Sequence, residues 1–361
     1  MSDQCTEFRL ITDDRKLREF CLRIDGSARL AIDTEFVRER TYYPQLCLVQ
    51  IATEDSIAAV DCLAGLDLDK LFATLHASHR SWVLHSARQD LEVLYLQVEQ
   101  APAELIDTQL AAALLGFPLQ IGLKGLCQEV LGIEIGKEHT RMNWSRRPLP
   151  AAAIDYALDD VRYLLPLWNA LAERLHDRQR LEWFREDCAS ALGQPIQPDT
   201  ASILDRTKGA GALRGRRRAA AMALIEWREA EAQSKDLPRR WILADDVLVA
   251  IATRHPATIG ELGSIPKLPR RLTDRWGKSI LKALASAPEP DAEDGPAPQP
   301  NKATLRAIQA LVKAKAKELG IESEVLATRR DISAAASGQL PEPFTTGWRS
   351  SILADVLNQV D

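Results

Sequence analysis

Two carboxylates stand two residues apart in Asp33-Thr34-Glu35, directly after the short apolar run 30–32. Residues i and i+2 of a β-strand point to the same face, so the pattern predicts two acidic side chains side by side at a strand end. Like charges this close repel each other unless a cation or a proton lies between them. Oxygen ligands of this kind suit Mg²⁺ or Mn²⁺. A solvated turn at the end of a strand is the competing interpretation.

A third carboxylate, Asp90, closes the segment His85-Ser86-Ala87-Arg88-Gln89-Asp90, which follows a predicted strand at 82–85. The segment therefore predicts a junction between a strand and a helix. Open α/β sheets place their sites at such an edge. The alternative is a structural acid that interacts favourably with the N-terminus of the helix.

The fourth carboxylate, Asp160, lies four residues after Tyr156 in a segment with helical character. Residues i and i+4 share one face of a helix. A tyrosine one turn before a carboxylate can hold a water or a hydroxyl group beside whatever the carboxylate binds. A surface helix with a partly buried tyrosine would show the same pattern.

The elements that must position these residues alternate between strands and helices over residues 1–200. The first three expected strands are too close together for helical crossovers and predict an antiparallel meander. The strand-rich first half and helix-rich second half predict an α/β domain with a mixed sheet. The expected strands lie at 30–32, 45–52, 56–61, 82–85 and 105–106, and the helices near 108–116, 122–131 and 151–176.

Formal charge changes sign along the chain. It is −10 over residues 1–200, +8 over 201–284 and −3 over 285–361. Such asymmetry indicates separate modules, and the basic one fits a polyanionic partner. Basic clusters at 208–218 and 267–278 are typical of non-specific RNA binding. Solvated helix faces are the alternative explanation of these charges.

After residue 205 only helical patterns follow, interrupted by a segment rich in proline and acidic residues that cannot bury a core. We therefore predict one α/β domain followed by two small all-α domains. The predicted boundaries are 1–200 for the α/β domain, 206–286 for the first helical domain, 287–300 for the linker and 301–361 for the second helical domain.

Taken together, the order Asp-x-Glu, His-x-x-x-x-Asp and Tyr-x-x-x-Asp resembles the tyrosine subclass of the DEDD exonuclease superfamily. Segments 31–36, 43–51, 143–149 and 156–167 are similar to bacterial ribonuclease D. The resemblance covers the whole chain, because that family also carries two C-terminal HRDC-type domains; the second is the more divergent here. It implies a ribonuclease H-like fold and release of nucleoside 5′-monophosphates from the 3′ end of RNA, with tRNA precursors and other stable RNAs as substrates.

The resemblance also implies roles for the acidic residues and the tyrosine. Asp33 would bridge two divalent ions, either Mg²⁺ or Mn²⁺. Glu35 and Asp160 would complete one metal site, and Asp90 would complete the other. Tyr156 would orient the attacking water.

Candidate substrate contacts rest on weaker signals. Phe36 is either a base-stacking residue or a core aromatic, and His85 is expected to shape the site rather than act as a base. The segment Asp107-Thr108-Gln109 predicts a strand end and a helix cap. The candidate phosphate contacts are Arg141, Arg146 and Arg147.

Two other functions remain open. A DNA 3′-5′ exonuclease of the proofreading type would normally need a polymerase, and this chain does not encode one. A nucleic-acid-binding protein with a vestigial site is disfavoured by the complete set of acids. We expect a cytoplasmic monomer that does not enter membranes, since no secretory signal is visible and no apolar run approaches the ~18 residues of a spanning helix.

Overall fold

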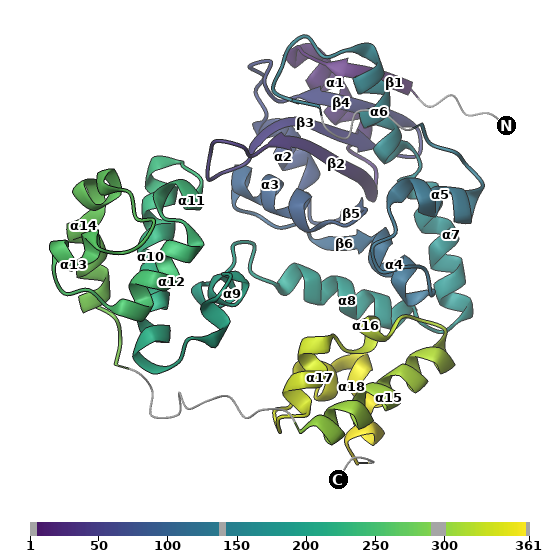
Figure 1. Cartoon of the computed structure of the whole chain (residues 1–361). Helices are drawn as coiled ribbons and strands as arrows, with labels where there is room; N and C mark the ends of the chain where they lie inside the picture. The colour runs from purple at the N-terminus through teal and green to yellow at the C-terminus, as the bar shows by residue number, and fades with distance from the viewer. Residues whose placement is uncertain (1–5, 137–141, 290–300, 359–361) are drawn as a thin grey trace. The chain divides into compact units, whose positions relative to one another are not determined.

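The computed structural model describes residues 6–136, 142–289 and 301–358 (Figure 1). These residues form two compact units that are not contiguous in the sequence. Unit 1 comprises Met1–Val37, Gln45–Gln194 and Pro300–Asp361, and unit 2 comprises Arg38–Pro44 and Pro195–Gln299. The domain boundaries expected from the sequence stay a prediction. Within the described ranges, no helix combines the length and apolar character needed to cross a membrane.

Unit 1 is built on a six-stranded sheet with the order β1-β4-β3-β2-β5-β6. The strands β2, β3 and β4 are antiparallel neighbours, which confirms the predicted meander. The other pairings are parallel, so the sheet is mixed. The strands are β1 (Thr6–Ile11), β2 (Arg29–Val37), β3 (Gln45–Ala52), β4 (Ser56–Asp61), β5 (Ser81–Leu84) and β6 (Glu104–Asp107).

Two elements at the start of the chain are absent from the sequence-based prediction. Strand β1 pairs with β4, and helix α1 (Asp14–Ile24) follows it. Asp13 caps this helix, because its side chain accepts a hydrogen bond from the Lys16 N–H at 2.9 Å. The helix buries Leu17 and Phe20 on one face. Helix α2 (Asp69–Leu75), between β4 and β5, is a further addition.

The helices of unit 1 follow the prediction with one correction. The single helix expected at 151–176 is two helices, which meet at Tyr163. Pro166 explains the break, since its ring would clash with the carbonyl four residues earlier in a continuous helix. Helix α6 packs on β1 to β4. The helices are α3 (Arg88–Val98), α4 (Thr108–Leu114), α5 (Leu123–Leu131), α6 (Ala151–Arg162), α7 (Leu164–Asp177) and α8 (Leu181–Gly193).

The C-terminal helices belong to unit 1 and attach to α8. The indole rings of Trp183 and Trp348 stack at 4.3 Å with an interplanar angle of 7°. Buried Asp187 accepts hydrogen bonds from the Trp348 indole at 2.9 Å and from the Arg349 guanidinium at 2.5 and 2.9 Å. The helices of this region are α15 (Lys302–Leu319), α16 (Ser323–Leu326), α17 (Arg329–Ala335) and α18 (Gly347–Asn358).

Unit 2 contains the helices predicted for the basic segment. Its apolar core includes Leu224, Leu248 and Trp276, so Trp276 is a core residue rather than an exposed stacking platform. The main helices are α9 (Thr200–Arg206), α10 (Gly215–Lys235), α11 (Arg239–Ile242), α12 (Asp245–Arg254), α13 (Ile259–Gly263) and α14 (Arg270–Ala285).

The loop between β2 and β3 is part of unit 2. The Tyr42 hydroxyl donates to Glu229 at 2.9 Å and accepts from Gln233 at 3.1 Å. The backbone N–H groups of Tyr42 and Tyr43 both donate to Asp236, at 2.9 and 3.0 Å. The loop is therefore fixed to helix α10 by side-chain and backbone contacts.

Gly347→Ala should destabilise the protein more than Gly338→Ala. Both glycines have a positive φ, +68° and +81°, which costs an L-residue about 1–2 kcal/mol. A Cβ at Gly338 meets open space, whereas one at Gly347 collides with the Glu186 carboxylate. That carboxylate accepts a hydrogen bond from the Trp348 N–H at 2.9 Å, and its loss adds about 1 kcal/mol. Denaturant unfolding of both variants measures the difference, and equal losses would remove any role for the Glu186 contact.

Candidate active site

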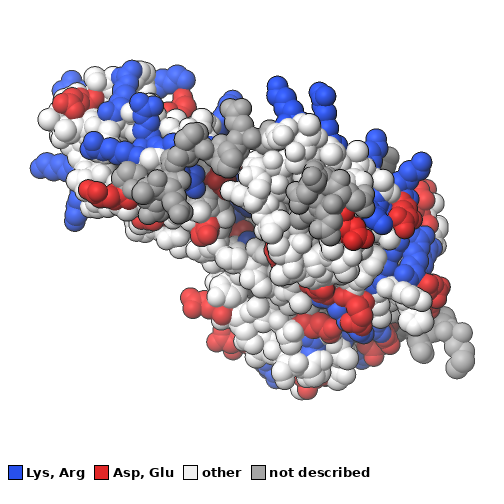
Figure 2. All heavy atoms as spheres, turned by 90° about the horizontal axis from the view of Figure 1, so that it is seen from below, with Lys and Arg blue, Asp and Glu red and all other residues white. Residues whose placement is uncertain are grey.

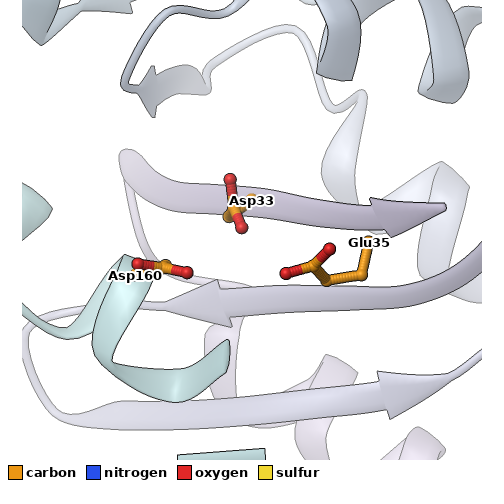
Figure 3. Close-up of side chains that lie close together, drawn as sticks. All are labelled: Asp33, Glu35 and Asp160. Carbon is orange, nitrogen blue, oxygen red and sulfur yellow. The ribbon is translucent and has the colours of Figure 1, made fainter. Parts of the chain in front are cut away.

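Three of the predicted acids converge between β2 and α6 (Figure 3). Strand β2 carries Asp33 and Glu35, and Asp160 approaches them from helix α6. One carboxylate oxygen of each lies within 4.8 Å of the others, and all three residues are partly buried. Residues 125 positions apart in the sequence, Glu35 and Asp160, thus meet in one cluster of carboxylate oxygens.

Asp90 lies beside this cluster in the first turn of α3 and is 8% exposed. The Thr34 hydroxyl donates a hydrogen bond to its carboxylate at 2.5 Å. Thr34 stands between Asp33 and Glu35 in β2, so one short strand segment both supplies two acids and holds a third. Sequence reasoning did not assign this role to Thr34, because the pattern does not show which side chain packs beside it.

The four carboxylates repel each other and are poorly hydrated. Burial, reinforced by repulsion from the neighbouring acids, raises the pKa of Asp33 well above its usual value. The same causes, with burial the largest, raise the pKa of Glu35 to about 8. Burial also raises the pKa values of Asp90 and Asp160 to about 6. A carboxylate cluster of this kind is stabilised by any cation that enters it.

Tyr156 lies beside the acids and contacts three side chains, those of Asp160, Trp144 and Lys124. Its hydroxyl donates to the Asp160 carboxylate, and burial raises the pKa of Tyr156, so the hydroxyl stays protonated. The ring stacks on Trp144 with centroids 6.3 Å apart. The Lys124 ammonium lies 4.8 Å from the ring centroid. The sequence signalled Lys124 only by its place at the start of a predicted helix.

The acids and Tyr156 are accessible from an open pocket of about 580 Å³, called the hollow below. All four acids and Tyr156 line it, as do two of the predicted substrate contacts, Phe36 and His85. Arg88, in the segment between His85 and Asp90, also lines the hollow and adds a cation that the sequence analysis had not assigned. The further lining residues are Thr34, Ser86, Gln89, Leu123 and Leu164.

Both ring nitrogens of His85 are engaged. Nε2 lies 2.9 Å from the Ile121 carbonyl, which can only accept, so Nε2 donates. Nδ1 lies 2.9 Å from the Thr108 hydroxyl. Burial lowers the pKa of His85 and favours the neutral ring. These contacts support the interpretation that His85 shapes the site rather than acting as a base.

The turn from β5 into α3 is organised by Asp107. Its carboxylate accepts hydrogen bonds from the backbone N–H groups of Ser86 at 3.0 Å, Ala87 at 2.9 Å and Gln109 at 2.9 Å. Ser86 has a φ of +62°, a conformation that a non-glycine residue adopts only when it is held. Asp107 therefore ends β6, caps α4 as predicted, and also fixes the turn that carries Asp90.

The predicted phosphate contacts do not line the hollow where they are described. Arg147 binds Asp61 through two hydrogen bonds, at 2.6 and 2.5 Å, and donates to the Trp144 carbonyl at 2.6 Å. Its guanidinium is thus used within the protein. Arg146 is exposed, and Arg141 lies outside the described residues. Phosphate binding by these three arginines stays a prediction.

Comparison with known proteins agrees with this geometry. The family model for 3′-5′ exonucleases matches residues 8–176, and that for the HRDC domain matches residues 217–284. The chain is 36% identical over 360 residues to ribonuclease D of Gluconacetobacter diazotrophicus, covering 96% of this chain and 91% of that protein. It is also 36% identical to ribonuclease D of Xanthomonas oryzae, covering 90% and 91%.

The fold matches the crystal structure of Escherichia coli RNase D, described as an exoribonuclease involved in structured RNA processing. That match has a TM-score of 0.83, 30% identity and 97% coverage of each chain. The sheet and its acidic hollow thus define a 3′-5′ exonuclease, a class whose domains use divalent metals. More specifically, the chain belongs to the ribonuclease D family and is a 3′-5′ exoribonuclease. The predicted fold class and enzyme class are confirmed.

The metal-free wild type should lose stability relative to Asp33→Asn as the pH rises from 5 to 8. The folded state raises the pKa of Glu35 to about 8 and those of Asp90 and Asp160 to about 6, whereas unfolded carboxyls titrate near ~4. Over this range the folded protein retains protons that the unfolded chain releases, so the free energy of unfolding falls with pH.

Replacing Asp33 removes one charge from the cluster and should weaken that dependence. Thermal unfolding in EDTA across the range measures it, and added Mn²⁺ should restore the wild type at high pH. A melting-temperature difference between the two proteins that does not change with pH would contradict the electrostatic account.

Proposed function

We propose that this enzyme hydrolyses RNA with two divalent cations, Mg²⁺ or Mn²⁺, and releases nucleoside 5′-monophosphates. The single observation that supports the proposal best is the convergence of Asp33, Glu35 and Asp160 on one point, with Asp90 beside them. The donor set contains only carboxylate oxygens, which suits these hard cations. On this proposal, the natural substrates of the enzyme are the 3′ ends of tRNA precursors and other stable RNAs.

The four acids are the proposed ligands. When bound between them, two cations lower the pKa of an attacking water and stabilise charge on the attacking and leaving oxygens. The protein's part is to keep the carboxylates in place despite their repulsion. The Thr34 hydroxyl orients Asp90, and the Tyr156 hydroxyl orients Asp160.

Tyr156 is the proposed positioning group for the attacking water. Its hydroxyl is protonated, lies beside Asp160 and faces the hollow. The ring has little freedom, because Trp144 and Lys124 contact it. A fixed hydroxyl can direct a water toward the phosphorus without taking its proton.

Basic residues on unit 2 support RNA as the substrate. Lys and Arg side chains gather on this unit, at the left of the view in Figure 2. Its net charge of +8 over residues 201–284 contrasts with −10 over residues 1–200. Lys and Arg side chains that displace counterions from phosphates provide affinity without sequence specificity. The E. coli relative acts in structured RNA processing, and we propose the same substrate class here, with the enzyme acting as a monomer.

The activity test compares end-labelled RNA and DNA. We expect a ladder of shortened products from single-stranded RNA and from a tRNA precursor in Mg²⁺ or Mn²⁺, none in EDTA, and none from Asp33→Asn. Thin-layer chromatography should identify the product as 5′-monophosphates. Equal or faster degradation of DNA would favour the alternative DNA exonuclease, and RNA binding without any ladder would favour a vestigial site.

Tyr156→Phe should lower kcat by about 10²–10⁴-fold, the usual range for a side chain positioned beside the reacting groups, with little effect on KM. The substitution removes the hydroxyl but keeps the ring between Trp144 and Lys124. Single-turnover kinetics measures the effect on the chemical step, and Mn²⁺ titration measures the effect on metal binding. An unchanged kcat would exclude Tyr156 from the mechanism, and a large loss of Mn²⁺ affinity would make it a support for Asp160 instead.

A further inference from the structure

Gln50 is a fully buried amide on strand β3, with 0% of its surface exposed. Neither its amide nitrogen nor its amide oxygen has a hydrogen-bond partner within the described part of the chain. Buried polar side chains are nearly always paired, so such a residue needs a specific explanation. An apolar side chain of the same length would fill the space without that penalty.

The position of Gln50 connects it to the acidic cluster. In the antiparallel ladder of β2 and β3, Gln50 is directly opposite Asp33. Opposite residues project to the same face, with Cβ atoms about 4.5–5.5 Å apart. That face is the one covered by helix α6, because Asp160 of α6 reaches the Asp33 carboxylate. The neighbour of Gln50 on the other side is Ala59 of β4, whose methyl side chain offers no hydrogen-bond partner.

Asp33 differs from Asp90 and Asp160 in the kind of group that donates a hydrogen bond to it. Asp90 accepts from the Thr34 hydroxyl, and Asp160 accepts from the Tyr156 hydroxyl. At Asp33 the hydrogen bond that the structure shows comes from the backbone of Thr34 and not from a hydroxyl group. Carboxylates that hold metal ions are in turn hydrogen-bonded by outer partners that fix their orientation. Gln50 is the buried donor on the strand position opposite Asp33.

We propose that Gln50 is a positioning residue for Asp33, whose amide nitrogen donates to the Asp33 carboxylate when the divalent cations are bound. This inference rests on the metal site of the proposed function. A neutral amide suits the role, because it can orient a carboxylate without cancelling the charge that attracts the cations. A lysine would cancel that charge, and a glutamate would add to the repulsion.

The test uses Gln50→Met, which keeps the length and removes the polar atoms. We expect the melting temperature in EDTA to stay the same or rise, since the metal-free protein loses two unpaired buried groups. Mn²⁺ affinity, measured by calorimetry without RNA, should fall about 10–100-fold, the range found for outer-shell partners of metal ligands. On a short oligomer kcat should also fall, with KM for RNA nearly unchanged.

Thr273→Val is the matched control. The Thr273 hydroxyl in α14 of unit 2 is also buried without a partner. Its replacement should likewise leave the melting temperature equal or higher, but it should change neither Mn²⁺ affinity nor kcat. A fall in Mn²⁺ affinity and kcat that is seen only in Gln50→Met would therefore reflect the position of Gln50 opposite Asp33, and not the removal of a buried polar group in general.

Two results would overturn the inference. One is Gln50→Met with wild-type Mn²⁺ affinity and kcat. The other is a clear fall in its melting temperature in EDTA, which would show that the amide is already paired without metal. If the variant does not fold, Gln50→Asn, which shortens the reach of the amide, is judged by its Mn²⁺ affinity and kcat alone. Asp33→Asn separates the two proposals. Wild-type Mn²⁺ affinity in Asp33→Asn would refute the metal site itself. Reduced Mn²⁺ affinity in Asp33→Asn but not in Gln50→Met would refute only the role of Gln50.

Discussion

The close approach of four poorly hydrated carboxylates is the constraint on which the rest of the catalytic unit depends. Burial, together with repulsion from neighbouring acids, raises the pKa values of Asp33, Glu35, Asp90 and Asp160, so keeping all four ionised side by side is unfavourable. Left to themselves, these side chains would turn away from one another into solvent. The fold resists this because the acids come from a central strand and two packed helices rather than from loops.

Contacts around the site fix the orientations of the acidic side chains and of Tyr156. Thr34 donates to Asp90, and Asp107 holds the turn from which the helix of Asp90 begins. On the opposite side, Trp144 and Lys124 confine the ring of Tyr156. Thr34, Trp144 and Lys124 contact side chains of the site directly, whereas Asp107 acts through backbone N–H groups. These contacts restrict the orientation of the side chains in the site, and fixed groups of this kind are what electrostatic stabilisation of a transition state requires.

The acids and Tyr156 could be proposed from the sequence because their spacings are local, i and i+2 on a strand and i and i+4 on a helix. Each spacing also has a structural explanation, and only their combined order, which resembles the DEDD exonucleases, singled out one site that includes Asp90. The sequence predicted the β2–β4 meander because the short connections exclude crossovers. It missed β1, whose place depends on pairing with β4 some 50 residues later, a contact that no local pattern encodes.

Long-range partners were hidden from the sequence for the same reason. The engagement of Arg147 by Asp61 and the contact of Lys124 with Tyr156 both join residues distant in the chain. Periodicity and motif spacing describe neighbours along the chain, so they cannot show which charged side chains are already paired.

The β2–β3 loop has a consequence for the order in which the protein can be completed during synthesis. Tyr42 leaves the ribosome early, but its hydroxyl partner Glu229 follows 187 residues later. The C-terminal helices that dock on α8 come later still. All six strands lie before residue 108, so the sheet can be synthesised well before the partners of its β2–β3 loop. Contacts of such sequence separation close slowly, so the docking of this loop on α10 belongs to a late stage of folding.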